Sequence, residues 1–169
     1  VKVVDKDVNF PEERKTSTEA LEADTLAVLS DLNHASQKGL QTIFDCSVGR
    51  STVNHPLGGR YQLTPTEASV QKLPVQHGVT HTASVMAQGF NPYVAEWSPY
   101  HGAAYAVIEA TARLVAAGAN WSKARFSYQE YFERMDKQAE RFGQPVAALL
   151  GSIEAQIQLG LPSIGGKDS

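Results

Sequence analysis

Apolar residues recur every three to four positions in four stretches of the chain, which is the spacing that gives a helix one buried face. These stretches predict helices over residues 16–39, 98–117, 127–142 and 144–160. The helix over 98–117 is expected to be the longest. In the last helix, the residues expected to face inward are Val146, Leu149, Leu150, Ile153 and Ile157.

Capping residues mark where several of these helices should begin. Thr16 with Glu19, and Ser127 with Glu130, have the spacing of a capping box, in which two side chains satisfy the first free N–H groups of a helix. The segment Thr64–Glu67 has the same spacing, and its proline suits a first helical turn. It predicts a fifth, shorter helix.

Strand patterns fall between the predicted helices. Residues 79–87 alternate between a mainly apolar face and a face of threonine, serine and methionine. Shorter segments predict strands at 40–46, around 52–53, at Phe126 and at 161–164. Because strands alternate with helices, we expect an α/β (α+β) protein with a mixed sheet and helices on one face.

Composition and charge narrow the class of protein. The chain has 169 residues, of which 42% are hydrophobic, so residues 16–169 can form one domain after a polar lead-in at 1–15. A net charge of −3 argues against a nucleic-acid partner, and no apolar run is long enough to predict a membrane span. The single cysteine, Cys46, is expected in the core. It excludes an internal disulfide and favours a reducing cytoplasm.

The strongest candidate for binding chemistry is the run of five residues Gly165, Gly166, Lys167, Asp168 and Ser169. Two glycines allow a backbone to approach a ligand closely, and the next three residues supply a cation, a carboxylate and a hydroxyl. A strand that leads into such a loop commonly presents N–H groups to phosphate. The alternative is a polar tail without a ligand.

Four residues spaced by four, His101, Tyr105, Glu109 and Arg113, should stack along one face of the helix over 98–117. Glu109 has two alternatives. It could bind magnesium, since carboxylates suit that hard cation, or it could form an ion pair with Arg113 one turn away.

The aromatic loop at 91–102 is expected to form an interface or cover a pocket.

Several longer runs resemble one enzyme family, the phosphoribosylformylglycinamidine synthases of the large, single-chain type. The resemblance extends from about Leu32 to Ser169. It implies the fold of the N-terminal domain of aminoimidazole ribonucleotide synthetase (PurM-like), in the second synthetase half of the enzyme, with the chain cut at its last loop. The runs are Gly58–Pro65, Gly89–Tyr93, Trp97–Ala103, Arg125–Phe132 and Ile164–Ser169.

The resemblance also implies a reaction, its cofactors and its partners. The family makes formylglycinamidine ribonucleotide in purine biosynthesis from formylglycinamide ribonucleotide and glutamine-derived ammonia, with ATP and magnesium. The chain would then be part of a carbon–nitrogen ligase and inactive alone. Its expected partners are the remaining domains of the synthase, the ribonucleotide substrate, and a second copy bound through an exposed sheet.

Site roles carried over from the family fall mainly on the last loop. Gly166 is implied to contact the nucleotide through its backbone, and Ser169 to contact the substrate through its hydroxyl. Of the residues of the family's auxiliary magnesium site only Glu109 is kept, since His77 and Arg113 stand where the family has an Asp and an Asn. A histidine and a charged arginine are poor magnesium ligands.

Two other functions stay open. The chain could be a non-catalytic module that binds nucleotide or holds an assembly together. It could also belong to a different enzyme of the same synthetase superfamily.

Overall fold

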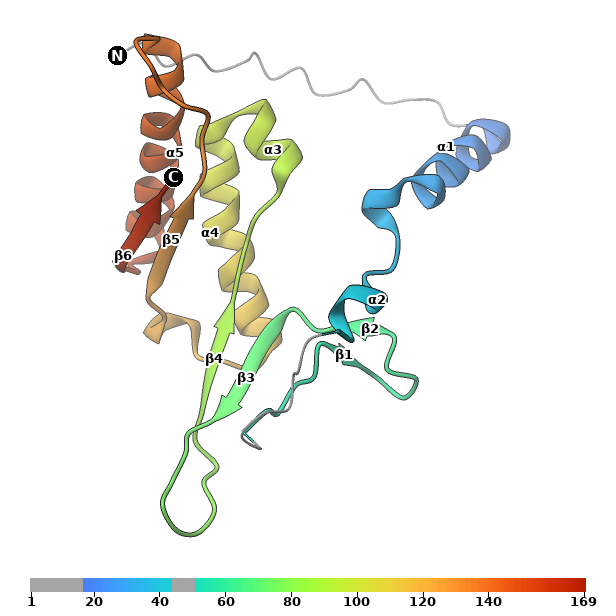
Figure 1. Ribbon diagram of the computed structural model, residues 1–169, viewed down its shortest axis with the longest axis vertical. Helices are drawn as coiled ribbons and strands as arrows, with labels where there is room; N and C mark the ends of the chain where they lie inside the picture. Colours follow the sequence, from blue (N-terminus) through green and yellow to red (C-terminus); the bar gives the residue numbers. More distant parts are fainter. Residues whose placement is uncertain (1–16, 44–50) are drawn as a thin grey trace.

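The computed structural model describes residues 17–43 and 51–169 (Figure 1). The predicted lead-in at 1–15, Thr16 and Cys46 therefore lie outside the described residues. The helices are α1 (Thr18–Ser30), η1 (Leu32–His34), α2 (Lys38–Gln41), α3 (Pro92–Trp97), α4 (Pro99–Ala116), η3 (Trp121–Lys123) and α5 (Ala139–Leu159). The strands are β1 (Leu57–Gly58), β2 (Thr64–Pro65), β3 (Ala68–Lys72), β4 (Ala83–Ala87), β5 (Phe126–Glu130) and β6 (Ser163–Asp168).

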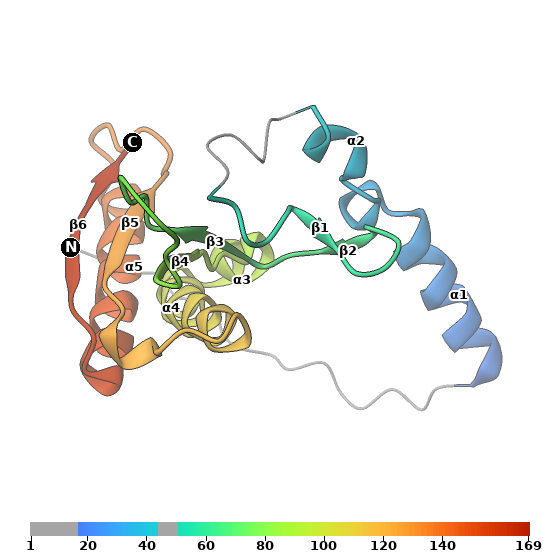
Figure 2. The same cartoon turned by 90° about the horizontal axis from the view of Figure 1, so that it is seen from below.

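The fold mixes helices and small sheets, which confirms the α+β class. In the described chain the strands form three two-stranded sheets, in which β1–β2 and β3–β4 are antiparallel and β5–β6 is parallel. Helices α4 and α5 lie side by side next to β5 and β6 (Figures 1 and 2). The core forms where these elements meet, from Val107, Ala110, Phe126, Ala155 and Leu161.

Helix α4 follows the sequence pattern closely. It begins after Ser98, whose fully buried side chain accepts a hydrogen bond from the His101 N–H, and the chain turns away at Gly118 with a φ of 82°. Serine at an N-cap and glycine after a C-cap satisfy the free backbone groups at the two ends. The predicted range of 98–117 is therefore confirmed, but α4 is not the longest helix as expected, because it has 18 residues and α5 has 21.

Helix α5 packs against α4 through small residues rather than large ones. A Cβ atom at Gly151 would lie 2.0 Å from the Tyr100 carbonyl oxygen, so the two backbones approach closely at this point. The buried residues of α5 are Gly143, Ala147, Ala148, Gly151, Ser152 and Ala155. The predicted inward face was wrong: Leu149, Leu150, Ile153 and Ile157 are exposed, and Val146 is half-buried.

Two predicted helix starts are strands instead. Residues 68–72, expected in a helix after Thr64, form β3 and pair with β4 in the register Val70↔Val85. Residues 127–130, expected to begin a helix, belong to β5, and α5 starts only at Ala139. In both segments the capping-box spacing is present in the sequence, but pairing with another strand decides the backbone.

Three smaller expectations also differ from the structure. Residues 79–82 precede β4 rather than belonging to it. Residues 92–97, expected as a loop, form helix α3, because the Asn91 side chain accepts hydrogen bonds from the N–H groups of Tyr93 and Val94. The start of the strand predicted over 40–46 lies in the helical turn α2.

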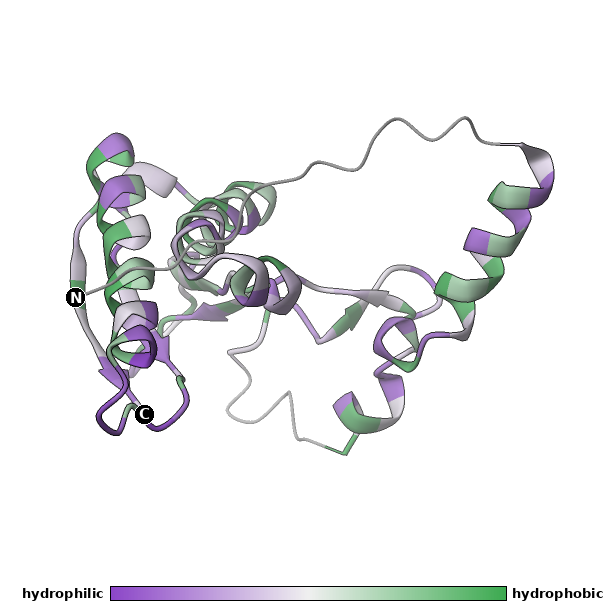
Figure 3. Cartoon of the chain, turned by 90° about the horizontal axis from the view of Figure 1, so that it is seen from above, coloured by the Kyte–Doolittle hydropathy of each residue, from purple (hydrophilic) through white to green (hydrophobic). Residues whose placement is uncertain are grey.

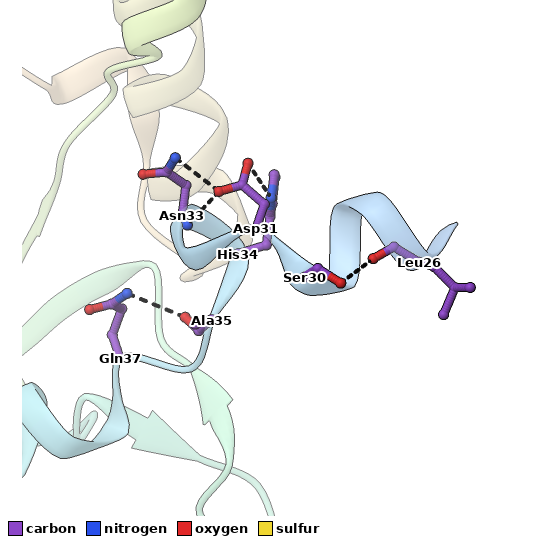
Figure 4. Close-up of polar contacts among 7 residues, drawn as sticks. All are labelled: Leu26, Ser30, Asp31, Asn33, His34, Ala35 and Gln37. Carbon is purple, nitrogen blue, oxygen red and sulfur yellow. Dashed lines mark hydrogen bonds and ion pairs between the residues drawn. The ribbon is translucent and has the colours of Figure 1, made fainter. Parts of the chain in front are cut away.

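Helix α1 lies apart from α4 and α5 (Figures 1 and 3). Ser17 caps it, and in the described chain none of its residues is buried; Leu29, for example, is 74% exposed. Figure 4 shows how it ends: Asp31 accepts hydrogen bonds from the backbone and side chain of Asn33 and lies 3.5 Å from His34. Across the described ranges, no helix combines the length and apolar character needed to cross a bilayer.

Candidate functional site

The candidate site lies at the carboxyl ends of two parallel strands. Strand β5, helix α5 and strand β6 form a β–α–β unit, so β5 and β6 end at the same edge. In α/β proteins this edge is where ligands commonly bind. The register Gln129↔Lys167 and Glu130↔Asp168 brings the predicted site residues to this edge.

Residues 165–168 form a strand, whereas the sequence predicted a loop. Hydrogen bonding even continues past β6, because the Ser169 N–H donates to the Glu130 carbonyl and the Phe132 N–H donates to the Ser169 carbonyl, both at 3.0 Å. The pairing uses one edge of β6. Among the residues the structure describes, no strand pairs with its other edge, and alternate N–H groups of a strand point to that side.

Gly166 has a packing reason to be glycine. A Cβ atom there would lie 2.7 Å from the Tyr128 carbonyl oxygen and 3.1 Å from the Tyr128 Cβ atom. The close approach of β5 therefore accounts for this glycine without a ligand. The role of Gly165 and Gly166 in contacting a nucleotide stays a prediction.

Lys167 and Ser169 come together at the end of β6. The Lys167 Nζ donates to the Ser169 Oγ at 2.5 Å, and both side chains are exposed. An ammonium group beside a hydroxyl offers several donors to an anionic oxygen. This pair is suited to phosphate or carboxylate groups.

Two carboxylates lie opposite each other on the same two strands. Burial raises the pKa of the Glu130 carboxyl, and the neighbouring Asp168 carboxylate raises it further. A bound cation would relieve this repulsion, and carboxylate oxygens are magnesium ligands. Sequence reasoning assigned Glu130 to a helix cap. The alternation of Phe126, Tyr128 and Glu130 was the signal that could have placed it on a strand.

Tyr128 lies two residues before Glu130 on the same face of β5, and it packs against the core. Burial raises its pKa to about 12. Within the described part of the chain its buried hydroxyl has no hydrogen-bond partner. Tyr128 therefore behaves as a packing residue, with an unsatisfied polar atom at the edge of the site.

The second candidate, Glu109, forms the predicted ion pair. Its Oε1 lies 2.8 Å from the Arg113 Nη2, and its Oε2 accepts a hydrogen bond from the Phe90 N–H at 2.8 Å. Both oxygens are thus engaged, so a metal would compete with Arg113. Over residues 17–43 and 51–169, no group of three acidic, histidine or cysteine residues could hold a metal ion.

The rest of the predicted helix ladder does not form one wall. His101 shares a hydrogen bond of 2.8 Å with the buried Ser98 Oγ and stacks on Trp97 at a centroid distance of 5.4 Å. Tyr105 is exposed. Residues 77 and 81, both histidines, lie on the connection between β3 and β4.

Comparison with known proteins gives one structural likeness. The structure of PurLQS from Thermotoga maritima resembles this chain with a TM-score of 0.64 and 16% sequence identity. The match covers 100% of this chain and 24% of that one, so this chain spans about a quarter of its length. No protein-family model and no curated protein matches the sequence. At this identity the likeness establishes the fold.

Proposed function

We propose that this chain is part of a phosphoribosylformylglycinamidine synthase and supplies a portion of its nucleotide- and substrate-binding surface. Two kinds of observation support the proposal. The sequence runs resemble that family, and the fold resembles PurLQS over the whole of this chain. The fold likeness is the observation that carries the proposal, because it does not depend on any single motif.

In this proposal the carboxyl edge of β5 and β6 binds the phosphorylated ligands. The Lys167 ammonium would attract a phosphate, and the Ser169 hydroxyl would donate a hydrogen bond to the ribonucleotide. Free N–H groups on the open edge of β6 would support the same ligand. These residues position and neutralise the ligand, which is most of what a protein contributes to phosphoryl transfer.

The residues at this edge fit a magnesium–nucleotide complex in their chemistry. Glu130 and Asp168 offer carboxylate oxygens. Burial is the main cause of the raised pKa of Glu130, and Asp168 adds a smaller repulsion that a cation would remove. Magnesium, when bound, would neutralise charge on the transferred phosphate. Glu109 fits a metal less well, since Arg113 and the Phe90 N–H occupy both of its oxygens.

One test of the proposal uses the intact enzyme that would contain this chain. Ser169→Ala should raise the KM for formylglycinamide ribonucleotide about tenfold, the cost of one hydrogen bond to a charged group. Ser163→Ala is the matched control, because Ser163 is equally exposed on β6 but lies at its opposite end. Unchanged KM and kcat in Ser169→Ala would remove this residue from the site.

The chain alone, given ATP, ammonia and the ribonucleotide, should show no turnover, and measurable amidine formation would contradict this expectation.

A second candidate is a non-catalytic assembly module, favoured by the open edge of β6. An unpaired edge is a template for another strand, including one from a second copy. Sedimentation and ATP titration separate the two candidates. A stable dimer without ATP affinity favours assembly, whereas micromolar ATP binding by a monomer favours a retained pocket. A third possibility is a different enzyme of the same synthetase superfamily. The ribonucleotide that the intact enzyme prefers would distinguish it from a phosphoribosylformylglycinamidine synthase.

A further inference from the structure

Arg113 joins three segments that are far apart in the sequence. Its Nη2 lies 2.8 Å from Glu109 on the same helix, its Nε lies 2.6 Å from the Glu67 Oε2 just before β3, and its Nη1 donates to the Gln88 carbonyl just after β4 at 2.8 Å. We infer that this guanidinium is a latch that fixes the β3–β4 hairpin against helix α4. The inference goes beyond the proposed function and does not depend on it.

The latch is placed at the open end of the hairpin. Ala68 pairs with Ala87 at that end, so Glu67 and Gln88 lie next to the last pair of the ladder. One side chain on α4 thereby holds both strands. The Phe90 N–H, bonded to the second oxygen of Glu109, extends the same network by two residues.

Apolar packing gives the hairpin little additional attachment. Within β3 and β4 as described, Val70 is the buried residue, and Met86 is 65% exposed. The hairpin projects beyond the end of α4 (Figure 1). Two residues after β4 the backbone approaches α4 closely at Gly89, where a Cβ atom would lie 2.0 Å from the Ala106 carbonyl oxygen. The orientation of the hairpin therefore depends on this approach and on the latch.

Arginine has the geometry that the latch requires. Its planar guanidinium carries five donors in a fixed fork, so three nitrogens can serve three acceptors at once. Lysine has one nitrogen and cannot reach all three in the same arrangement. The side chain of Arg113 is 26% exposed, so its ion pairs are only partly screened by solvent.

Hydrogen–deuterium exchange of the 169-residue chain tests the latch. In Arg113→Met, amide exchange over residues 68–88 should rise about tenfold, the loss expected for hydrogen bonds to a charged group. Exchange in α5 should stay unchanged. Arg113→Lys should give an intermediate rise. The matched control is Arg125→Met, because within the described residues the Arg125 guanidinium bonds to the nearby carbonyls of Lys123 and Ala124.

Two outcomes would overturn the latch. One is unchanged exchange over 68–88 in Arg113→Met, and the other is a rise of equal size in α5. If Arg113→Met does not fold, Glu67→Gln replaces it, because Glu67 is 56% exposed and its loss removes a single ion pair. That variant should raise exchange over 68–72 about threefold, and no rise would contradict the inference.

Salt gives an independent measurement. Raising the salt concentration to 1 M screens partly exposed ion pairs, so exchange over 68–88 should increase in the parent chain but not in Arg113→Met. An equal salt response in both proteins would refute the latch.

Discussion

At the scale of single residues, the carboxyl group of Glu130, which lies beside Asp168, sets a dependence of stability on pH. The two residues lie opposite each other on β5 and β6, and the pKa of Glu130 is raised first by burial and then by Asp168. A carboxyl whose pKa is higher in the folded state favours the fold in its protonated form. Its contribution is therefore complete below pH 4.5, the ordinary value, and is lost as pH rises through the raised pKa.

Glu130→Gln should stabilise the chain at pH 7, because glutamine keeps the shape of the protonated carboxyl without its charge. The gain should be about 0.5 kcal/mol or less, since this side chain is only partly buried and its charge is partly screened by solvent. Urea unfolding at pH 7 and pH 3.5 measures it, with a gain expected only at pH 7. Asp168→Asn is the companion variant and should give a smaller gain, because burial is the larger cause of the shift. A gain at pH 3.5 as large as that at pH 7 would contradict this account.

Tyr128→Phe should leave stability at pH 7 unchanged or raise it, because the variant removes a buried hydroxyl that has no partner. Since its pKa is raised from 10.0 to about 12, the parent chain should lose stability between these two pH values, where the unfolded chain ionises first. By pH 11 the difference between the two proteins should grow by about 1 kcal/mol after screening. Urea unfolding at pH 7, 10 and 11 measures it. The other tyrosines are common to both proteins, so a constant difference would show that Tyr128 has no raised pKa.

At the scale of elements, helix α5 shows how small residues decide which face of a helix is buried. Helix α5 packs against α4, and the buried residues of α5 include three of its alanines and both of its glycines, while Leu149, Leu150, Ile153 and Ile157 are exposed. Hydrophobic periodicity identifies the helix correctly, but it predicts that the face with the large apolar residues is the buried one. Close packing against another backbone needs the small ones instead, as at Gly151.

Hydrophobicity alone predicts that a change at a leucine of α5 costs more stability than a change at an alanine. We expect the opposite order. Ala147→Leu should destabilise the chain by about 1–3 kcal/mol, because Ala147 is buried and a larger side chain would overpack the core there. Leu150→Gln should cost about 0.5 kcal/mol or less, since this residue is exposed and glutamine is a comparable helix former. Thermal unfolding of both variants measures the difference. The reverse order would show that α5 buries its other face.

The sequence predicted those elements whose ends carry local signals. Helix α4 has its serine cap and its terminal glycine, and α5 ends at Gly160 with a φ of 67°. Strands β3 and β5 were predicted as helices because their capping boxes are local, whereas their partners β4 and β6 lie elsewhere in the chain. The same limit applies to the sites. The Glu109–Arg113 pair follows from a spacing of four residues, but the contact of Arg113 with Glu67 requires the fold.

At the scale of the whole molecule, the described residues divide into parts of unequal burial. Helices α4 and α5 with β5 and β6 contain most of the buried residues, whereas α1 contains none in the described chain. An isolated helix of 13 residues is marginal in water, because nucleation is costly and packing supplies most helical stability. The protection of the α1 amide groups from hydrogen exchange therefore depends on which other residues or molecules pack against α1.

Amide exchange should follow this division in the isolated chain. Residues 18–30 should exchange at least about 100-fold faster than the central parts of α4 and α5, because they can open without exposing a core. Mass spectrometry of peptides after brief labelling measures the ratio. Equal protection of α1 and α4 would contradict the expectation and would indicate that α1 is covered by another copy or by residues outside the described ranges.

The parallel pairing of β5 with β6 also constrains the order in which the molecule folds. Strands β3 and β4 are joined by a short connection and can pair as a local hairpin, whereas β5 meets β6 only after the chain between them has crossed over as α5. Closing the longer loop costs more entropy before any contact compensates for it. We therefore expect the β3–β4 hairpin to form before β5 pairs with β6.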